Sequence, residues 1–147
     1  MLEAVKLLAT LCCGVFFGAA LYISLVQHPA ALETGNEFAA RFFPPMYGRA
    51  AAMQASLAVV GCAAAIAAWL RGAGRWWLAA AVLLGSVVPF TLVVMKPVND
   101  ALLQGGDVST VELDALLIRW GYLHWACTVA SGLAFVTFLV AIVRRAV

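Results

Sequence analysis

The two histidines of the chain, His28 and His124, are the side chains best suited to proton transfer near neutral pH. An imidazole can accept and return a proton in that range, and it also binds transition metals. Trp120 lies four residues before His124, so on a helix its ring would lie beside the imidazole. His28 is followed by Pro29, so a role in ending a helix explains it as well as a catalytic role does.

Other polar groups are expected at the same membrane face as the histidines. They are Arg49, Gln54, Lys96, Asn99 and Asp100. Such groups are costly inside a membrane and tend to face the interior of a helix bundle, so they define a candidate polar site with the histidines. An interfacial belt at the lipid headgroups is the alternative for several residues, namely Arg49, Lys96, Arg119, Tyr47, Trp120, Tyr122 and Trp125.

A metal centre is a further interpretation of the histidines. His28 and His124 with Asp100 or Glu33 would supply two imidazoles and a carboxylate, the set typical of non-haem iron, and copper is the other candidate. No HxxxH or ExxH spacing supports such a centre. A haem between the two imidazoles fits less well, because both are expected at one end of a bundle. The four cysteines lie in apolar segments and are expected to be small buried side chains.

The composition determines which elements must position these groups. Of 147 residues, 65% are hydrophobic and only 11% are charged, whereas an average soluble domain has about 25% charged residues. The chain is therefore expected to be an integral membrane protein. A net charge of +2, scattered along the sequence, excludes the clustered basic face of a nucleic-acid-binding protein.

Four apolar segments predict an all-α fold, a four-transmembrane-helix antiparallel bundle in a single domain, 1–147. The first segment is too long for the apolar part of a signal peptide, which has about 7–15 residues. Pro44 and Pro45 suit the start of a helix, and Pro89 is expected to kink the third span. Ser109 or Thr110 is expected to cap the helix that leads into the fourth. The expected spans are 7–26, 49–70, 76–95 and 120–143, with extracytoplasmic loops at 27–48 and 97–119.

Lysines and arginines near the span ends predict the orientation. Lys6, Arg71, Arg75, Arg144 and Arg145 fall on one side, and Arg41, Arg49, Lys96 and Arg119 fall on the other with most of the acidic residues. Both termini are therefore expected in the cytoplasm, with a bacterial inner membrane as the expected location. The Gly14 and Gly18 spacing predicts close helix contact within the bundle, and a homo-oligomer through the same residues is the alternative.

Several short segments stand out along the chain, namely Gly18-Ala19-Ala20-Leu21-Tyr22, His28-Pro29-Ala30, Tyr47-Gly48-Arg49, Pro89-Phe90-Thr91, Pro97-Val98-Asn99 and Trp120-Gly121-Tyr122-Leu123-His124. In order and spacing they resemble the anthrone oxygenase-like family of small four-helix membrane proteins. The resemblance implies a membrane-embedded oxygenase, which in characterised fungal and bacterial members converts an anthrone to an anthraquinone. Val98 and Cys127 depart from the family pattern, which often has Thr and Arg at those positions, and without that Arg the pocket lacks a cation.

The resemblance also implies which residues act. His28, Tyr47, Arg49, Asn99, Trp120 and His124 match the family pattern. An anthrone carbanion can react with O₂ without a cofactor, so the protein would need a base, His124 or His28, and groups that hold the developing oxyanion. Arg49 with Lys96 or Asn99 is the expected oxyanion site. Substrate contacts are expected from Trp120, Tyr47, Gln54, Lys96 and Phe90.

Two other functions are consistent with the same residues. The polar end could bind a lipid headgroup, a quinone or a partner subunit without catalysis, and Arg49 and Lys96 at interface depth suit an anionic headgroup. An iron or copper oxidase held by the histidines is the second alternative. A transporter fits least, because no charged residue is expected at mid-membrane depth. The expected partners are membrane lipids and a hydrophobic small molecule.

Overall fold

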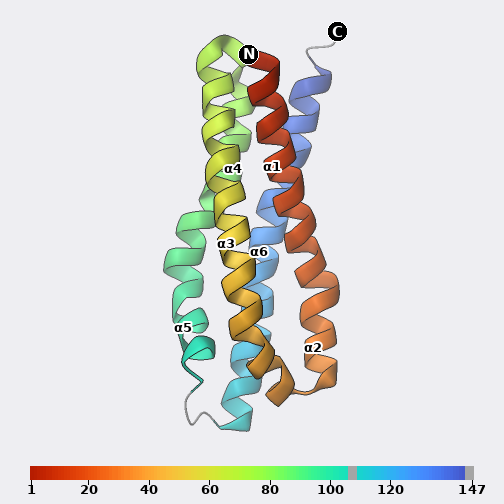
Figure 1. Ribbon diagram of the computed structural model, residues 1–147, viewed down its shortest axis with the longest axis vertical. Coiled ribbons are helices and arrows are strands. Elements are labelled where there is room, and N and C mark those ends of the chain that lie inside the picture. Colours follow the sequence, from red (N-terminus) through yellow and green to blue (C-terminus); the bar gives the residue numbers. More distant parts are fainter. Residues whose placement is uncertain (106–108, 145–147) are drawn as a thin grey trace.

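The computed structural model describes residues 1–105 and 109–144, and in these ranges the chain forms four long helical rods and no strand (Figure 1). All four rods are long and apolar enough to cross a membrane. The predicted all-α four-helix membrane bundle is therefore confirmed. The rods comprise α1 (Leu2–Tyr22), η1 (Ile23–Gln27) and α2 (His28–Thr34), then α3 (Asn36–Ala68) and η2 (Trp69–Ala73), then α4 (Arg75–Phe90), η3 (Thr91–Met95) and α5 (Lys96–Gln104), and finally α6 (Thr110–Val143).

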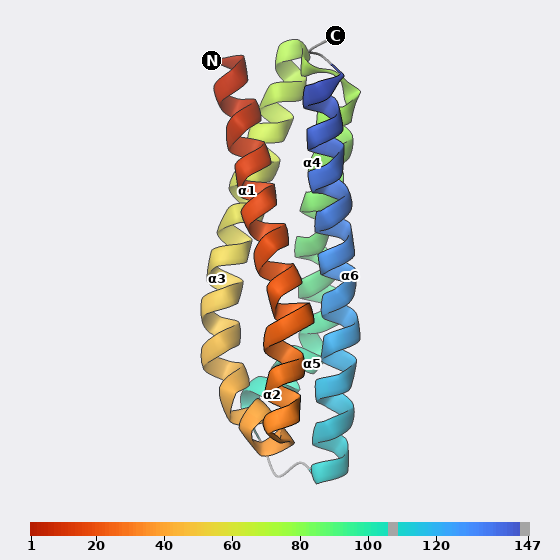
Figure 2. The same cartoon turned by 90° about the vertical axis from the view of Figure 1, so that its right-hand side faces the viewer.

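Neighbouring rods run antiparallel (Figure 2). They pack closely through small residues. α1 packs on α3 and α6, and α4 packs on the same two helices. Ala9, Ala65, Ala80 and Ala134 are fully buried, so the helix backbones approach one another. A Cβ at Gly14 would lie 2.9 Å from the Phe135 ring. The Gly14 contact therefore lies within the bundle.

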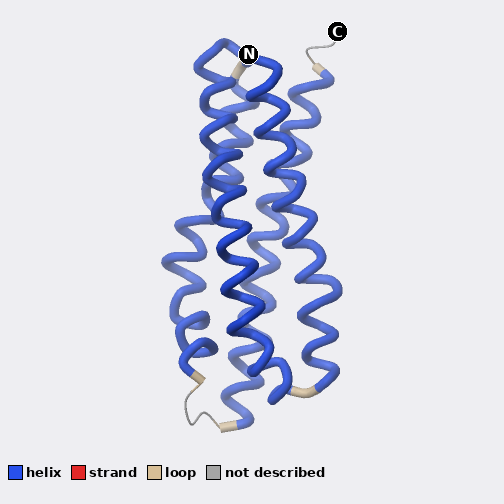
Figure 3. Tube along the Cα trace, in the orientation of Figure 1, coloured by secondary structure: helices blue, strands red, loops and turns tan. Residues whose placement is uncertain are grey.

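The connections between the first three rods are short and use glycines with positive φ. Gly35 (φ 119°) joins α2 to α3, and Gly72 (φ 82°) and Gly74 (φ 100°) lie where η2 meets α4 (Figure 3). A residue with a Cβ is strained at such angles.

The start of α1, η2 and the end of α6 lie at one end of the bundle (Figure 1). Which end faces the cytoplasm stays a prediction.

The helices extend further than the spans expected from hydropathy. Much of 27–48 and 97–119 is helical, in α2, α5 and the first turns of α3 and α6. The predicted helix start at Pro44 and Pro45 is wrong, because α3 begins at Asn36 and continues through both prolines. Ala39 and Phe43, one turn apart, are both buried. This apolar face gives the first turns of α3 a packing surface that offsets the missing N–H groups.

Two local predictions are confirmed by the backbone and its hydrogen bonds. Ser109 caps α6, because the Glu112 N–H donates to Ser109 Oγ over 3.3 Å. The third rod is irregular just after Pro89, where α4 gives way to the π-helical turn η3. Below this turn the chain steps outward into α5 (Figure 1). A proline lacks an N–H, so irregular hydrogen bonding of this kind is expected next to it.

Candidate active site

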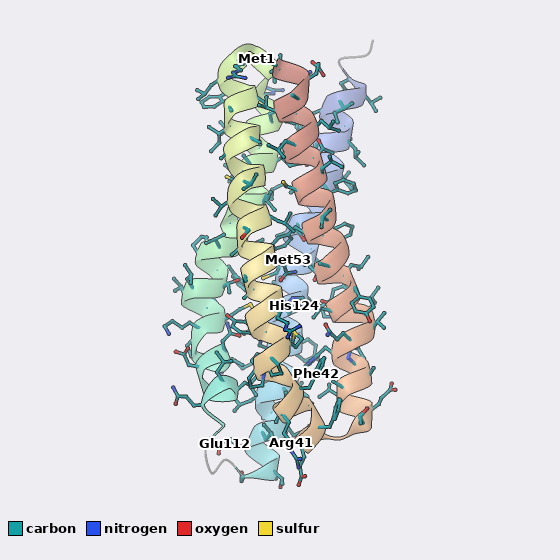
Figure 4. The ribbon with its side chains drawn as sticks, viewed as in Figure 1. Met1, Arg41, Phe42, Met53, Glu112 and His124 are labelled. Atoms are coloured by element: carbon teal, nitrogen blue, oxygen red, sulfur yellow. The ribbon has the colours of Figure 1, made fainter. Side chains whose placement is uncertain are left out.

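A cavity of about 180 Å³ lies among the helices, in the half of the bundle that leads to α2 and α5. Its walls are mostly apolar and come from all four rods. Figure 4 shows His124 at this level, inside the bundle. The lining residues are Phe16 and Ile23 from the first rod, Met46, Tyr47, Ala50, Ala51, Gln54, Ala55 and Ala58 from α3, Val87, Val88, Thr91, Leu92 and Met95 from α4 and η3, and Trp120, His124 and Cys127 from α6.

His124 is the buried imidazole of this cavity, and hydroxyl groups hold its orientation. Ser24 Oγ lies 2.9 Å from His124 Nδ1 and 2.9 Å from Thr128 Oγ1. Thr128 Oγ1 in turn lies 3.3 Å from the Ala20 carbonyl oxygen. His124 Nε2 has no hydrogen-bond partner in the described part of the chain, so it is available to a molecule in the cavity. The bond at Nδ1 thus fixes the orientation of the imidazole, while Nε2 remains free to bind a ligand.

Trp120 forms an aromatic wall beside His124. The two ring centroids are 4.7 Å apart and the rings are nearly parallel, at 19°. This is the arrangement that the spacing of four residues predicts. Phe43 packs edge-on against the same indole at 5.2 Å. The Trp120 Nε1–H donates to Asn99 Oδ1 over 2.9 Å. Trp120 is therefore fixed by ring contacts and by a buried hydrogen bond.

His28 has a different environment from His124. Its Nε2–H donates to the carbonyl oxygen of Leu117 over 3.1 Å, and its ring contacts Trp120 with centroids 5.0 Å apart. His28 is not among the residues that line the cavity. The two histidines therefore share one indole as a neighbour, but only His124 faces the cavity. The hydrogen bond to α6 indicates a structural role for His28.

Gly121 is what lets His28 approach α6. A Cβ at this position would lie 2.9 Å from His28 Nε2 and 3.0 Å from His28 Cδ2, too close for either ring atom. Gly121→Ala is therefore expected to break the bond to Leu117 and to lower the free energy of unfolding by about 1–3 kcal/mol. Thermal unfolding in detergent measures this loss.

Gly18→Ala is the matched control, since Gly18 is also helical and a Cβ there would have no neighbour within 4 Å. Gly18→Ala is expected to cause no loss of stability, and the better helix propensity of alanine should raise the free energy of unfolding by up to about 1 kcal/mol. Equal stability of the two variants would show that His28 is not held by this contact.

Two further residues that line the cavity, Tyr47 and Gln54, carry hydrogens that are free to donate. Tyr47 OH accepts a hydrogen bond from Asn99 Nδ2 over 3.0 Å, and no acceptor for its own hydrogen lies among the described residues. Gln54 Nε2 is buried without a partner in the same part of the chain. A buried donor without a partner costs about 1–3 kcal/mol. Unpaired donors of this kind suit a ligand oxygen.

Most of the charged candidates lie outside the cavity. Arg49 is exposed, and Lys96 forms an exposed ion pair with Asp100, with Nζ and Oδ2 2.6 Å apart. Phe90 is half-buried and does not line the cavity either. Asn99 is buried, but both ends of its amide are used by Trp120 and Tyr47.

The residues considered for a metal do not come together. His28 and His124 both contact the Trp120 ring, but Asp100 pairs with Lys96 instead of joining them. Across residues 1–105 and 109–144, no three His, Cys, Asp or Glu side chains form a group that could hold a metal ion. The four cysteines are free thiols, and the Cys127 thiol donates to Met95 Sδ over 3.7 Å.

Comparison with known proteins gives consistent matches. The family model described as anthrone oxygenase matches residues 43–137, a region that contains Tyr47, Gln54, Trp120 and His124. Anthrone oxygenase gedH of Aspergillus terreus is 35% identical over 119 residues, which cover 74% of this chain and 79% of that protein. Anthrone oxygenase tpcL of Aspergillus fumigatus is 32% identical over 118 residues, 73% of each chain. No solved structure matches.

Proposed function

Because this chain belongs to the anthrone oxygenase family, we propose that it uses O₂ to oxidise a polycyclic aromatic carbon acid of the anthrone class in the cavity beside His124. One observation carries the proposal. His124 Nε2 and the donors of Tyr47 and Gln54 are unpaired and belong to residues that line a single apolar cavity. That set provides one base and two donors, which suits deprotonation of a carbon whose negative charge is delocalised onto a carbonyl oxygen.

His124 would begin the reaction as a general base. Its Nε2 takes a proton from the ring carbon opposite the carbonyl, which leaves a carbanion whose charge is delocalised onto the carbonyl oxygen. The carbanion gives one electron to O₂, and the resulting radical and superoxide combine into a carbon–oxygen bond. The proton on His124 then passes to the outer peroxide oxygen.

Loss of water completes the oxidation. The second hydrogen on the same carbon leaves as a proton while the O–O bond breaks, so that a carbonyl forms at that carbon. One anthrone and one O₂ thus give one quinone and one water, and no external reductant is needed. Ser24 and Thr128 act in this scheme as positioning residues that hold the His124 ring.

The developing oxyanion would be held by neutral donors. Tyr47 OH and Gln54 Nε2 take this role in place of Arg49 and Lys96, which are exposed. Cys127, at a lining position where the family often has Arg, supplies no charge. Preorganised dipoles in a water-poor site stabilise a developing charge strongly even without a cation. Trp120 provides a flat wall on which a planar ring system can stack.

Incorporation of labelled oxygen tests the proposed function directly. The protein in lipid nanodiscs is supplied with an anthrone under ¹⁸O₂, and the products are analysed by mass spectrometry together with O₂ uptake. We expect one labelled oxygen in the quinone and one O₂ consumed per product, at a rate above that of empty nanodiscs. Formation of the quinone at the rate of empty nanodiscs would contradict the proposal.

A further inference from the structure

The exposure of the cavity lining differs sharply between the two sides of the cavity. Phe16, Ile23, Trp120, His124 and Cys127, from the first rod and α6, are all buried. Every lining residue that is half-buried or exposed belongs to α3, α4 or η3. The two that count as exposed are Ala55 on α3 and Leu92 on η3, which is 63% exposed. The cavity therefore opens sideways, between α3 and η3.

Two local features keep this side open. From Ala50 to Ala58, α3 presents the alanines 50, 51, 55 and 58 to the cavity, and Gln54 is the one longer side chain among the lining residues of this stretch. On the other side, the third rod changes direction at η3, just after Pro89 (Figure 1). The small residues of α3 and this change of direction together leave an opening between the rods.

The opening lies at the depth of the lipid acyl chains. Arg49 and Lys96 are exposed cations, which in a membrane extend to the headgroup level. Ala55 lies six residues further into its span than Arg49, about 9 Å along the helix at 1.5 Å per residue. Leu92 lies four residues inside Lys96, about 6 Å by the same rise. Ala55 and Leu92 at the rim of the opening are both apolar, so their side chains form no hydrogen bonds with water.

The end of the cavity nearer the polar loops is closed. Phe43, Asn99 and Trp120 lie on that side, and their exposed fractions are 2%, 3% and 2%. Trp120 bonds to Asn99, Asn99 bonds to Tyr47, and Phe43 packs on Tyr47 with ring centroids 5.4 Å apart. This connected layer blocks entry from the aqueous end. The lateral opening is therefore the route left for a ligand.

We propose that a planar, uncharged polycyclic aromatic molecule enters this cavity from the bilayer, sideways between Ala55 and Leu92, with its reactive edge leading toward His124. The inference rests on the proposed function for the identity of the ligand, and adds its source and its direction of approach. At about 180 Å³ the cavity is smaller than the usual ligand pocket, which has about 300–1,000 Å³. A polycyclic ligand is therefore only partly enclosed by the cavity. The ring farthest from His124 remains in the opening between Ala55 and Leu92.

Blocking the opening tests the route. An anthraquinone carried in lipid vesicles is mixed with the protein in vesicles, and its association is followed by quenching of tryptophan fluorescence. Ala55→Phe places a ring in the opening and is expected to slow association about tenfold, because entry then requires the helices to separate. Leu92→Phe narrows the opening from the other side without adding a tryptophan to the fluorescence signal, and it is expected to act likewise. Both sites are exposed, so neither change disturbs the core.

Ala52→Phe is the matched control, because Ala52 is exposed on the same helix but does not line the cavity. It is expected to leave the association rate unchanged. Wild-type rates in Ala55→Phe and Leu92→Phe would overturn the lateral route, and so would equal slowing by Ala52→Phe. If neither variant at the opening slows association, the opening would hold a lipid acyl chain and would not be the route of the ligand.

The readout separates this proposal from the proposed function. Association of an anthraquinone needs no turnover, so protein that binds it through the opening but does not oxidise an anthrone contradicts the catalytic proposal alone. Protein that oxidises an anthrone at the same rate with and without Phe at position 55 contradicts the lateral route alone. Failure to bind an anthraquinone from vesicles also contradicts the lateral route.

Discussion

Replacing His124 by asparagine is expected to lower kcat for anthrone oxidation about 10²- to 10⁴-fold, the usual contribution of a general base. The asparagine amide can still reach Ser24 in the place of Nδ1, but no group replaces Nε2. The loss should therefore appear in the chemical step, with little effect on folding. Single-turnover oxidation in nanodiscs measures the rate constant of the chemical step without interference from product release.

His28→Gln is the matched comparison for this result. Glutamine retains a donor that can reach the Leu117 carbonyl, and His28 does not line the cavity. We expect kcat to fall less than about tenfold, since His28 acts only through packing and one backbone hydrogen bond. Equal losses for His28→Gln and His124→Asn, or a loss below about tenfold for His124→Asn, would contradict the assignment of His124 as the base.

The architecture of this bundle was largely predictable because it follows from local patterns. Four apolar segments and the Ser109 cap each depend on a few neighbouring residues, and the structure contains all of them. The family resemblance is likewise confirmed by the family match and the two relatives. The helical start of α3 was missed because the packing partners of Phe43, such as Trp120, come from another rod.

The site was only partly predictable, because its contacts join distant parts of the chain. Trp120 and His124 share a helix, so their spacing predicts their stacking. Ser24 and His124 are 100 residues apart, and no periodicity relates them. The hydroxyl of Thr128, one turn after His124, was a local signal that the sequence did carry. Arg49 lies near the cavity residues in sequence, yet its side chain is exposed, which residue type alone does not determine.

Gln54→Met is expected to lower kcat/KM about 10²- to 10³-fold, as the loss of one oxyanion donor typically does. Methionine has about the shape of glutamine, so the cavity wall is retained while both N–H groups are lost. The reason to choose Gln54 over Tyr47 is structural. Tyr47→Phe would leave the buried Asn99 amide without its partner, whereas Gln54 Nε2 has no partner to lose among the described residues.

The same variant should gain stability while it loses activity. A buried amide donor without a partner costs about 1–3 kcal/mol, and methionine removes that cost. Thermal unfolding in detergent should therefore show an unchanged or higher midpoint for Gln54→Met. Gln104→Met, the same change at an exposed position outside the cavity, is the control and should alter neither property. Full activity in Gln54→Met would contradict the oxyanion role, whereas lower stability would show that the amide is paired in the free protein. A stabilised but slow enzyme would mean that the unpaired donor is retained for the transition state, where its hydrogen bond is finally made.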